Sequence, residues 1–359
     1  MTLIIFFSIL IFACINGFFF LALKSTFKKV KISLKQNCFS IIIAAKNEEK
    51  NLEALFTSLQ MIDYDNDKFE VIFVDDNSTD NTFKFASELI EGNQNFRIIK
   101  CVDKPFAGKK GALAVGIQSA KFPFILITDA DCVPENGWLK AYSNYFNRGF
   151  DFLFGIAPFH QTTNNMNKIS CFENLRNSIL SFSLTELGFP YSASARNFGF
   201  RKESFEKIGG YSNTTETLSG DDDLLLREAI KHKLKVGCIT NRSSWVFSNS
   251  KITLRDYLNQ KARHTETSLH YLFSRQIVLG LWHLINMVML FSPFLVFFDR
   301  RFFLLFLTKM ILDLVLIKLN EKKFGYSFQF FEIISLQIFY EFFLIINFFN
   351  ASTKKIEWK

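Results

Sequence analysis

The chain has 359 residues, 49% of them hydrophobic and 16% aromatic, and a formal net charge of +8. Charge-poor stretches at both ends leave about 250 residues for a soluble part, enough for one domain of catalytic size. The Lys and Arg residues are scattered and many flank apolar stretches, which favours anionic lipid headgroups as partners and argues against nucleic acid. Six cysteines show no pairing or metal-binding spacing, as expected in a reducing compartment.

The start of the chain predicts a membrane anchor. Residues 2–23 carry no charge and would cross the roughly 30 Å hydrocarbon core as a helix. No basic residue precedes this stretch, and five lysines follow it: Lys24, Lys28, Lys29, Lys31 and Lys35. This pattern favours a retained transmembrane helix over a cleaved signal peptide, and it places the following domain in the cytoplasm.

The end of the chain predicts about three further spans. The apolar segments are Ile277–Phe298, Phe302–Leu319 and Phe328–Phe349. The middle segment contains Lys309 and Asp313, whose i,i+4 spacing allows them to pair on one helix face. Four spans in all would place the basic tail outside the cell, against the charge rule that sets the central domain inside. The side of the C-terminus therefore stays open.

These patterns predict that the chain divides into five parts. They are an anchor at 1–23, a central domain at 24–250, a segment at 251–276, membrane helices at 277–349 and a tail at 350–359. The segment before the membrane helices alternates basic and apolar residues, which is typical of an interfacial amphipathic helix.

The central domain alternates strand-like and helix-like segments. Apolar runs lie at Phe39–Ala45, Phe69–Val74, Phe96–Cys101 and Phe124–Thr128, and helical patterns lie near 48–59, 80–91 and 109–120. This alternation predicts β-α-β units in a mostly parallel, Rossmann-like α/β sheet covered on both faces. In such sheets ligands bind at the carboxyl ends of the strands.

A metal site is predicted where the fourth run ends. Asp129 and Asp131 follow the apolar run directly, so the turn can aim both carboxylates at one point. Hard divalent cations such as Mg²⁺ or Mn²⁺ bind carboxylate oxygens together with the oxygens of a diphosphate. Acidic turns after strands are common, so this motif indicates a metal site only together with the other polar strand ends.

A second polar strand end contains Asp75 and Asp76. Ser78 or Thr79 can cap the next helix, which explains those residues without any ligand. The two aspartates lie before the cap, where a base or ribose could be hydrogen-bonded. Together with the polar residues at 46–49 after the first strand, they point to one crevice.

The third predicted helix opens with glycine and lysine. Gly108, Lys109 and Lys110 stand at its start, where backbone N–H groups and a lysine favour a phosphate. The spacing is not that of a Walker loop.

Taken in order, these motifs resemble family 2 glycosyltransferases of the GT-A fold, which are inverting enzymes that use nucleotide sugars. The similar segments are Ile41–Glu48, Val74–Thr82 and Gly108–Ala112, followed by the family's metal-binding Asp-x-Asp at Asp129 and Asp131. The resemblance implies a donor site formed by Ala45, Asn47, Glu48, Asp76, Gly108, Lys109, Asp129, Gln260, Arg263 and His264.

The second half of the central domain implies the catalytic base. The run from Ser219 to Arg227 resembles the family's Glu-Asp-x-Asp-Leu motif with Gly220 in place of Glu. In that register Asp221 is the base, Asp222 is the variable position and Asp223 is a structural acid. An acidic helix N-terminus, favoured by the helix dipole, also accounts for one of the three.

A motif near position 260 bears on processivity. Residues 260–264 resemble the Gln-x-x-Arg-Trp motif of polysaccharide synthases, with His264 replacing Trp. This departure favours a non-processive, hexosyltransferase-type enzyme over a processive synthase; a non-catalytic scaffold that binds sugar nucleotides is the third alternative.

The resemblance implies a location and partners as well. We expect a multi-pass protein of the bacterial inner membrane with its catalytic domain in the cytoplasm. It would use a nucleotide sugar, a UDP-sugar as first choice, and a lipid-linked or envelope glycan acceptor.

Overall fold

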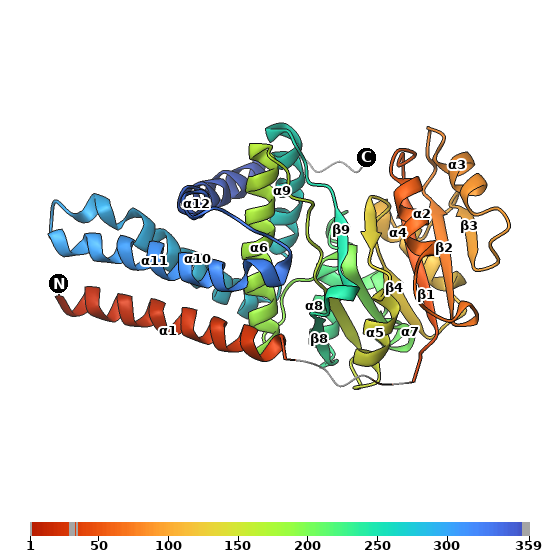
Figure 1. Cartoon of the computed structure of the whole chain (residues 1–359), viewed down its shortest axis with the longest axis horizontal. Coiled ribbons are helices and arrows are strands. Elements are labelled where there is room, and N and C mark those ends of the chain that lie inside the picture. Colours follow the sequence, from red (N-terminus) through yellow and green to blue (C-terminus); the bar gives the residue numbers. More distant parts are fainter. Residues whose placement is uncertain (1, 29–32, 34, 354–359) are drawn as a thin grey trace. The chain divides into compact units, whose positions relative to one another are not determined.

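The computed structural model describes residues 2–28, 33 and 35–353, and these residues form two units (Figure 1). An α/β unit contains the described residues of 29–160 and 190–249, and a helical unit contains those of 1–28, 161–189 and 250–354. The segment 161–189, which lies inside the predicted central domain, thus belongs to the helical unit.

A seven-stranded sheet forms the centre of the α/β unit, in the order β3-β2-β1-β4-β7-β6-β8. Its strands are β1 Phe39–Ala45, β2 Phe69–Asp75, β3 Phe96–Lys100, β4 Phe124–Ile127, β6 Phe152–Gly155, β7 Phe198–Arg201 and β8 Val236–Ile239. The first four are parallel, β7 is antiparallel to both of its neighbours, and β6 is parallel to β8. The prediction of a mostly parallel sheet is confirmed. A separate antiparallel pair joins β5 Cys132–Pro134 to β9 Val246–Ser248.

The helices of this unit are α2 Leu52–Gln60, α3 Thr82–Leu89, α4 Gly108–Ser119, α5 Trp138–Phe146, α7 Lys202–Lys207 and α8 Asp223–Lys231. The first three match the predicted helical segments. The first of them begins at Leu52, later than predicted, because the polar residues at 47–51 make loop hydrogen bonds.

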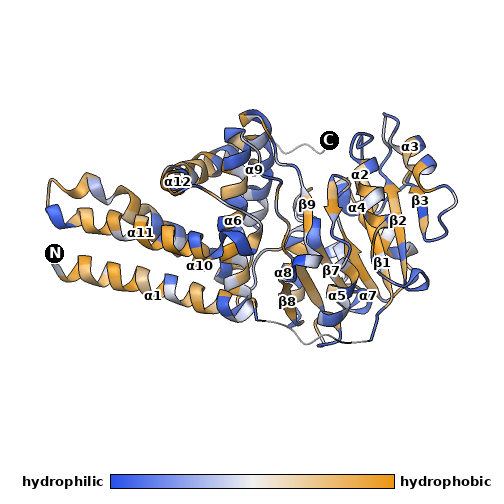
Figure 2. Cartoon of the chain, in the orientation of Figure 1, coloured by the Kyte–Doolittle hydropathy of each residue, from blue (hydrophilic) through white to orange (hydrophobic). Residues whose placement is uncertain are grey.

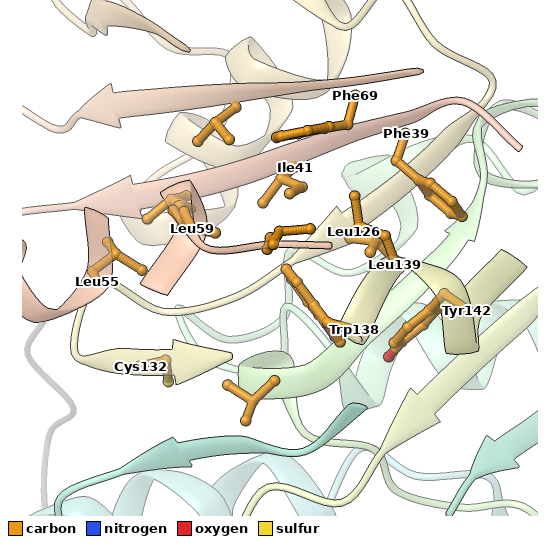
Figure 3. Packing of buried hydrophobic residues seen from close by; sticks show 14 of the residues in the cluster. Phe39, Ile41, Leu55, Leu59, Phe69, Leu126, Cys132, Trp138, Leu139 and Tyr142 are labelled. Atoms are coloured by element: carbon orange, nitrogen blue, oxygen red, sulfur yellow. The ribbon is translucent and has the colours of Figure 1, made fainter. Parts of the chain in front are cut away.

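The core of the α/β unit follows from strand alternation. Phe39, Ile41 and Ile43 of β1 point to one cluster, as a period of two requires. In Figure 3, Trp138 and Tyr142 of α5 lie in the same cluster as Phe39 and Ile41.

A buried polar side chain is satisfied at the edge of this core. The Oδ1 atom of Asn197 accepts hydrogen bonds from Trp138 Nε1 and Tyr142 Oη, each at 2.9 Å. Its Nδ2 donates to the carbonyls of Ile156 and Ser244, each at 2.9 Å. Because all its capacity is used, this wholly buried amide anchors the segment before β7 at little cost.

The helical unit contains α1 Thr2–Thr26, α6 Asn165–Glu186, α9 Leu254–Ser268, α10 Phe273–Phe291, α11 Phe303–Asn320 and α12 Phe330–Thr353. Helix α11 packs against both α1 and α10, and these three helices run side by side in Figure 1. Helix α12, seen nearly end-on in that view, crosses them and packs on α6 and α9.

Three helices of the described chain are long and apolar enough to cross a membrane: Thr2–Thr26, Phe273–Leu295 and Phe330–Asn350. Their outward faces are apolar (Figure 2), with Leu3 71% and Phe331 80% exposed. Such faces are expected to contact lipid. The predicted middle segment does form a helix, α11, but its three charged residues keep it out of this group. Two of the three expected C-terminal spans are therefore among these candidates.

The charges of α11 lie inside the helical unit. Lys309 Nζ lies 3.0 Å from Asp313 Oδ2 and 3.1 Å from Glu341 Oε1 of α12, and it donates to Asn286 Oδ1 of α10 at 2.6 Å. Arg176 of α6 lies 3.2 Å from Asp313 Oδ1. All five side chains are buried. The predicted pairing of Lys309 with Asp313 is present. Glu341 and Arg176 add one charge of each sign, so the network has no net charge.

Candidate active site

Polar residues meet at the carboxyl ends of the parallel strands. The register pairs Ala45 with Asp75 at the ends of β1 and β2, and the N–H of Asp76 donates to the Ala45 carbonyl at 2.7 Å. Strand β4 pairs with the other side of β1, and Thr128 joins its end to Asp129. The polar strand ends therefore share one edge of the sheet, where ligands of such sheets bind.

The acidic turn after β4 is compact. Ligand atoms of Asp129, Asp131 and Cys132 all lie within 4.8 Å of one another. The N–H of Cys132 donates to the Asp129 carbonyl at 3.2 Å, and the pairing of Cys132 with Ser248 anchors the turn to β9. Two carboxylates held this closely fit a hard divalent cation.

The thiol of Cys132 is one site component that the sequence did not indicate. Burial, reinforced by the charges of Asp131 and Asp129, raises the pKa of this thiol well above its usual value. The thiol donates to Asp131 Oδ1 at 3.6 Å. Hard divalent cations prefer carboxylate oxygen to sulfur. A cation would be held by Asp129 and Asp131.

Lys109 joins the acidic turn to the predicted base. Its Nζ lies 2.6 Å from Asp129 Oδ1 and 2.7 Å from Asp221 Oδ2. The Lys109 side chain is only 11% exposed. The sequence predicted this lysine beside phosphate, and the structure places it between two carboxylates.

Backbone geometry explains why glycines stand on both sides of Lys109. Gly108 begins α4 with φ of 67°, in the left-handed region that favours glycine. A Cβ on Gly111 would lie 2.0 Å from the Phe106 carbonyl oxygen, so the close approach of that loop requires glycine. These two positions turn the chain so that Lys109 reaches the acidic side chains.

The three adjacent acids before and within α8 have different partners. Asp221 pairs with Lys109, whereas Asp222 accepts from the N–H of Asp223 and of Ala195, each at 2.7 Å. Asp223 Oδ1 accepts from the N–H of Ala193 at 2.9 Å. Asp222 is the N-cap of α8, and Asp223 ties its first turn to the segment before β7.

Charges within the site keep Asp221 and Lys109 ionised. Burial opposes ionisation of Asp221, but the charge and hydrogen bond of Lys109 outweigh it and lower the pKa of Asp221. Burial likewise opposes the charge of Lys109, but Asp129 and Asp221 raise the pKa of Lys109 well above its usual value. By contrast, burial and the neighbouring charges of Asp223 and Asp221 raise the pKa of Asp222.

The loop after β1 is fastened to the loop after β2. The N–H of Asn47 donates to Ser78 Oγ at 3.0 Å, and Asn47 Oδ1 accepts from the N–H of Thr79 at 2.8 Å. Glu48 N–H donates to Thr82 Oγ1 at 2.8 Å. The prediction that Ser78 or Thr79 caps α3 is wrong: the N-cap of α3 is Asn81, and Ser78 and Thr79 bond to Asn47 instead.

Asp76 has a cationic partner that the sequence did not indicate. Lys104 Nζ lies 2.5 Å and 2.7 Å from the two carboxylate oxygens of Asp76, and it also donates to the Gly108 carbonyl at 3.1 Å. Lys104 thereby links the end of β2 to the start of α4.

The other predicted donor residues lie outside the α/β unit. Gln260, Arg263 and His264 stand on α9 of the helical unit, and their i, i+3 and i+4 spacing places them on one helix face. Their part in donor binding stays a prediction.

Comparison with solved structures gives the class of the fold. The mannosyltransferase PcManGT from Pyrobaculum calidifontis, solved in complex with GDP-Man and Mn²⁺, aligns over 99% of this chain and 97% of that protein. The TM-score is 0.58 at 15% sequence identity. The α/β unit, with its acidic turn at the carboxyl edge, accordingly has the GT-A glycosyltransferase fold.

Sequence comparison gives the family. Residues 40–209 match the model of glycosyl transferase family 2. The glycosyltransferase AglE of Haloferax volcanii is 24% identical over 184 residues, which cover 51% of this chain and 58% of AglE. The beta-monoglucosyldiacylglycerol synthase of a Nostoc species is 35% identical over 109 residues, which cover 30% of this chain and 23% of that enzyme. The matches span little more than half of these relatives at most. The chain contains a glycosyl transferase family 2 domain.

Proposed function

We propose that this protein transfers a sugar, with inversion, from a nucleotide sugar to a lipid-linked or envelope glycan acceptor at the cytoplasmic face of a membrane. The observation that carries the proposal is the grouping of Asp129, Asp131 and Asp221 at one sheet edge, with Lys109 between the acidic turn and the base.

Asp221 is the base in this proposal. It is ionised, 13% exposed and paired with a lysine, and it would accept the proton of the acceptor hydroxyl. The hydroxyl oxygen forms a bond to the anomeric carbon as the bond from that carbon to the diphosphate breaks. The bonding electrons leave with the diphosphate, and a single displacement of this kind inverts the anomeric configuration.

Asp129 and Asp131 would hold a Mg²⁺ or Mn²⁺ ion. Such an ion neutralises the negative charge of the leaving diphosphate. The mannosyltransferase PcManGT was solved in complex with GDP-Man and Mn²⁺. We keep a UDP-sugar as the first choice of donor because the family resemblance favours it.

The membrane part of the proposal rests on the helical unit. Its apolar candidate spans suit an enzyme whose acceptor is lipid-linked. One relative is named as a synthase of a glucosyldiacylglycerol, which is consistent with a lipid acceptor. His264 in place of Trp supports transfer of single sugars.

A donor screen tests the function. The full chain, purified in detergent, is supplied with UDP- and GDP-sugars, Mn²⁺ and membrane lipid extract, and nucleotide release and labelled lipid are measured. We expect one donor class to give acceptor-dependent release that Asp221→Asn lowers by about 10²-fold or more, with an inverted product by NMR. Near-normal release by Asp221→Asn, or a product of retained configuration, would refute the mechanism.

A further inference from the structure

Lys109 occupies an unusual place for a phosphate-binding lysine. Its ammonium group shares two carboxylates that come from distant parts of the chain: Asp129 follows β4 and Asp221 precedes α8. Both contacts have the length of strong charge-assisted hydrogen bonds. The ammonium therefore offsets the repulsion that would otherwise separate these two acids.

The pairing has a consequence for the proposed metal site. Asp129 is both a proposed metal ligand and the partner of Lys109, so an ion on Asp129 and Asp131 would lie close to a fixed positive charge. In a half-buried site, repulsion between cations a few ångströms apart changes affinity by roughly tenfold or more. The same lysine that holds Asp221 in place should thus weaken metal binding.

We propose that Lys109 is a positioning residue that holds Asp129 and Asp221 together and lowers the intrinsic metal affinity of the Asp129–Asp131 turn. This inference rests on the proposed function and adds a regulatory feature to the same site. A donor diphosphate supplies an alternative anionic partner for the ammonium, so the metal binds well only together with the donor. The site would then hold little metal when no donor is bound.

The neighbouring lysine does not share this role. Lys110 Nζ donates to the carbonyls of Thr214 and Thr217, the latter at 2.9 Å, and so is tied to neutral backbone groups. The effect on metal affinity is therefore expected from Lys109 and not from lysines in general.

Mn²⁺ binding to the purified full chain without donor tests the proposal, with free Mn²⁺ measured by electron paramagnetic resonance. Lys109→Met and Lys109→Gln should bind Mn²⁺ roughly tenfold more tightly than the native chain. Lys109→Arg, which keeps the charge, should bind like the native chain. Lys140→Met is the matched control, because Lys140 is 46% exposed and pairs with Asp63 on the surface.

The direction of the change separates this role from a merely structural one. If Lys109 only supported the fold, both neutral variants would bind Mn²⁺ equally or more weakly, and that result would overturn the proposal. Thermal unfolding of both variants shows whether they are folded. Adding Asp129→Asn to Lys109→Met should remove the gain. If Asp129→Asn and Asp131→Asn leave Mn²⁺ binding unchanged in every background, the proposed metal site itself is wrong.

Discussion

The backbone N–H of Ala195 donates to Oδ2 of Asp222 at 2.7 Å, and this bond fixes the start of α8 to the segment before β7. The other oxygen of Asp222 accepts from the N–H of Asp223. The carboxylate of Asp222 thus accepts hydrogen bonds from the backbone, whereas its neighbour Asp221 pairs with Lys109. Two chemically identical substitutions at adjacent positions should therefore have different effects.

Asp221→Asn should lower turnover by about 10²- to 10⁴-fold and leave donor affinity nearly unchanged, because a general base acts only in the chemical step. Asp222→Asn should keep most of the turnover. It should lower stability by about 1–3 kcal/mol, because an amide NH₂ would face a backbone donor. Turnover, donor binding by calorimetry and thermal unfolding measure the three effects. An inactive Asp222→Asn beside an active Asp221→Asn would move the base to Asp222.

Asp129→Asn and Asp131→Asn should each abolish transfer and weaken metal-dependent donor binding, since each removes a negative ligand from a hard cation. Cys132→Ser is the control: hard cations prefer carboxylate oxygen to sulfur, so its Mn²⁺ titration should match that of the native chain. Near-normal transfer by both aspartate variants across Mg²⁺ and Mn²⁺ titrations would rule out the site. A changed metal preference in Cys132→Ser would make the cysteine a ligand.

Lys309→Met should strongly destabilise the helical unit, by about 3–5 kcal/mol, because it leaves buried Asp313 and Glu341 short of positive charge. The double variant Lys309→Met with Glu341→Leu should be more stable than the single variant, because Arg176 and Asp313 remain as a neutral pair. Thermal unfolding in detergent measures both.

Lys168→Met serves as the control for this network, since its side chain and that of its partner Glu332 are 32% and 26% exposed. It should change stability far less than Lys309→Met. A double variant less stable than Lys309→Met alone would contradict the network.

The α/β unit should face the cytoplasm. A cysteine at Lys84, whose side chain is 77% exposed on α3, should resist an impermeant maleimide in intact cells and react after lysis. Cys14 and Cys38, which are not buried, are first replaced by Ala. Labelling in intact cells would reverse the orientation inferred from the lysines after residue 23.

Local patterns were enough to predict much of the fold. The four parallel strands follow from short apolar runs such as Phe39–Ala45, because a strand buried on both faces needs continuous apolar residues. The Asp-x-Asp turn follows from the abrupt end of such a run. The pairing of Lys309 with Asp313 follows from helical spacing alone. Each of these features depends on residues close together in the sequence.

The remaining features depend on residues that meet only in the folded chain. Lys109 and Asp221 are separated by 112 positions, and Arg176 and Glu341 reach the α11 charges from other helices. Three adjacent aspartates look equivalent in sequence. In the folded chain Lys109 pairs with Asp221, and the backbone N–H groups of Ala195 and Ala193 bond to Asp222 and Asp223. Sequence spacing determined which groups could lie at a strand end or on a helix face; tertiary packing decided which charges neutralise one another, because Coulomb energies depend on distance and burial in space.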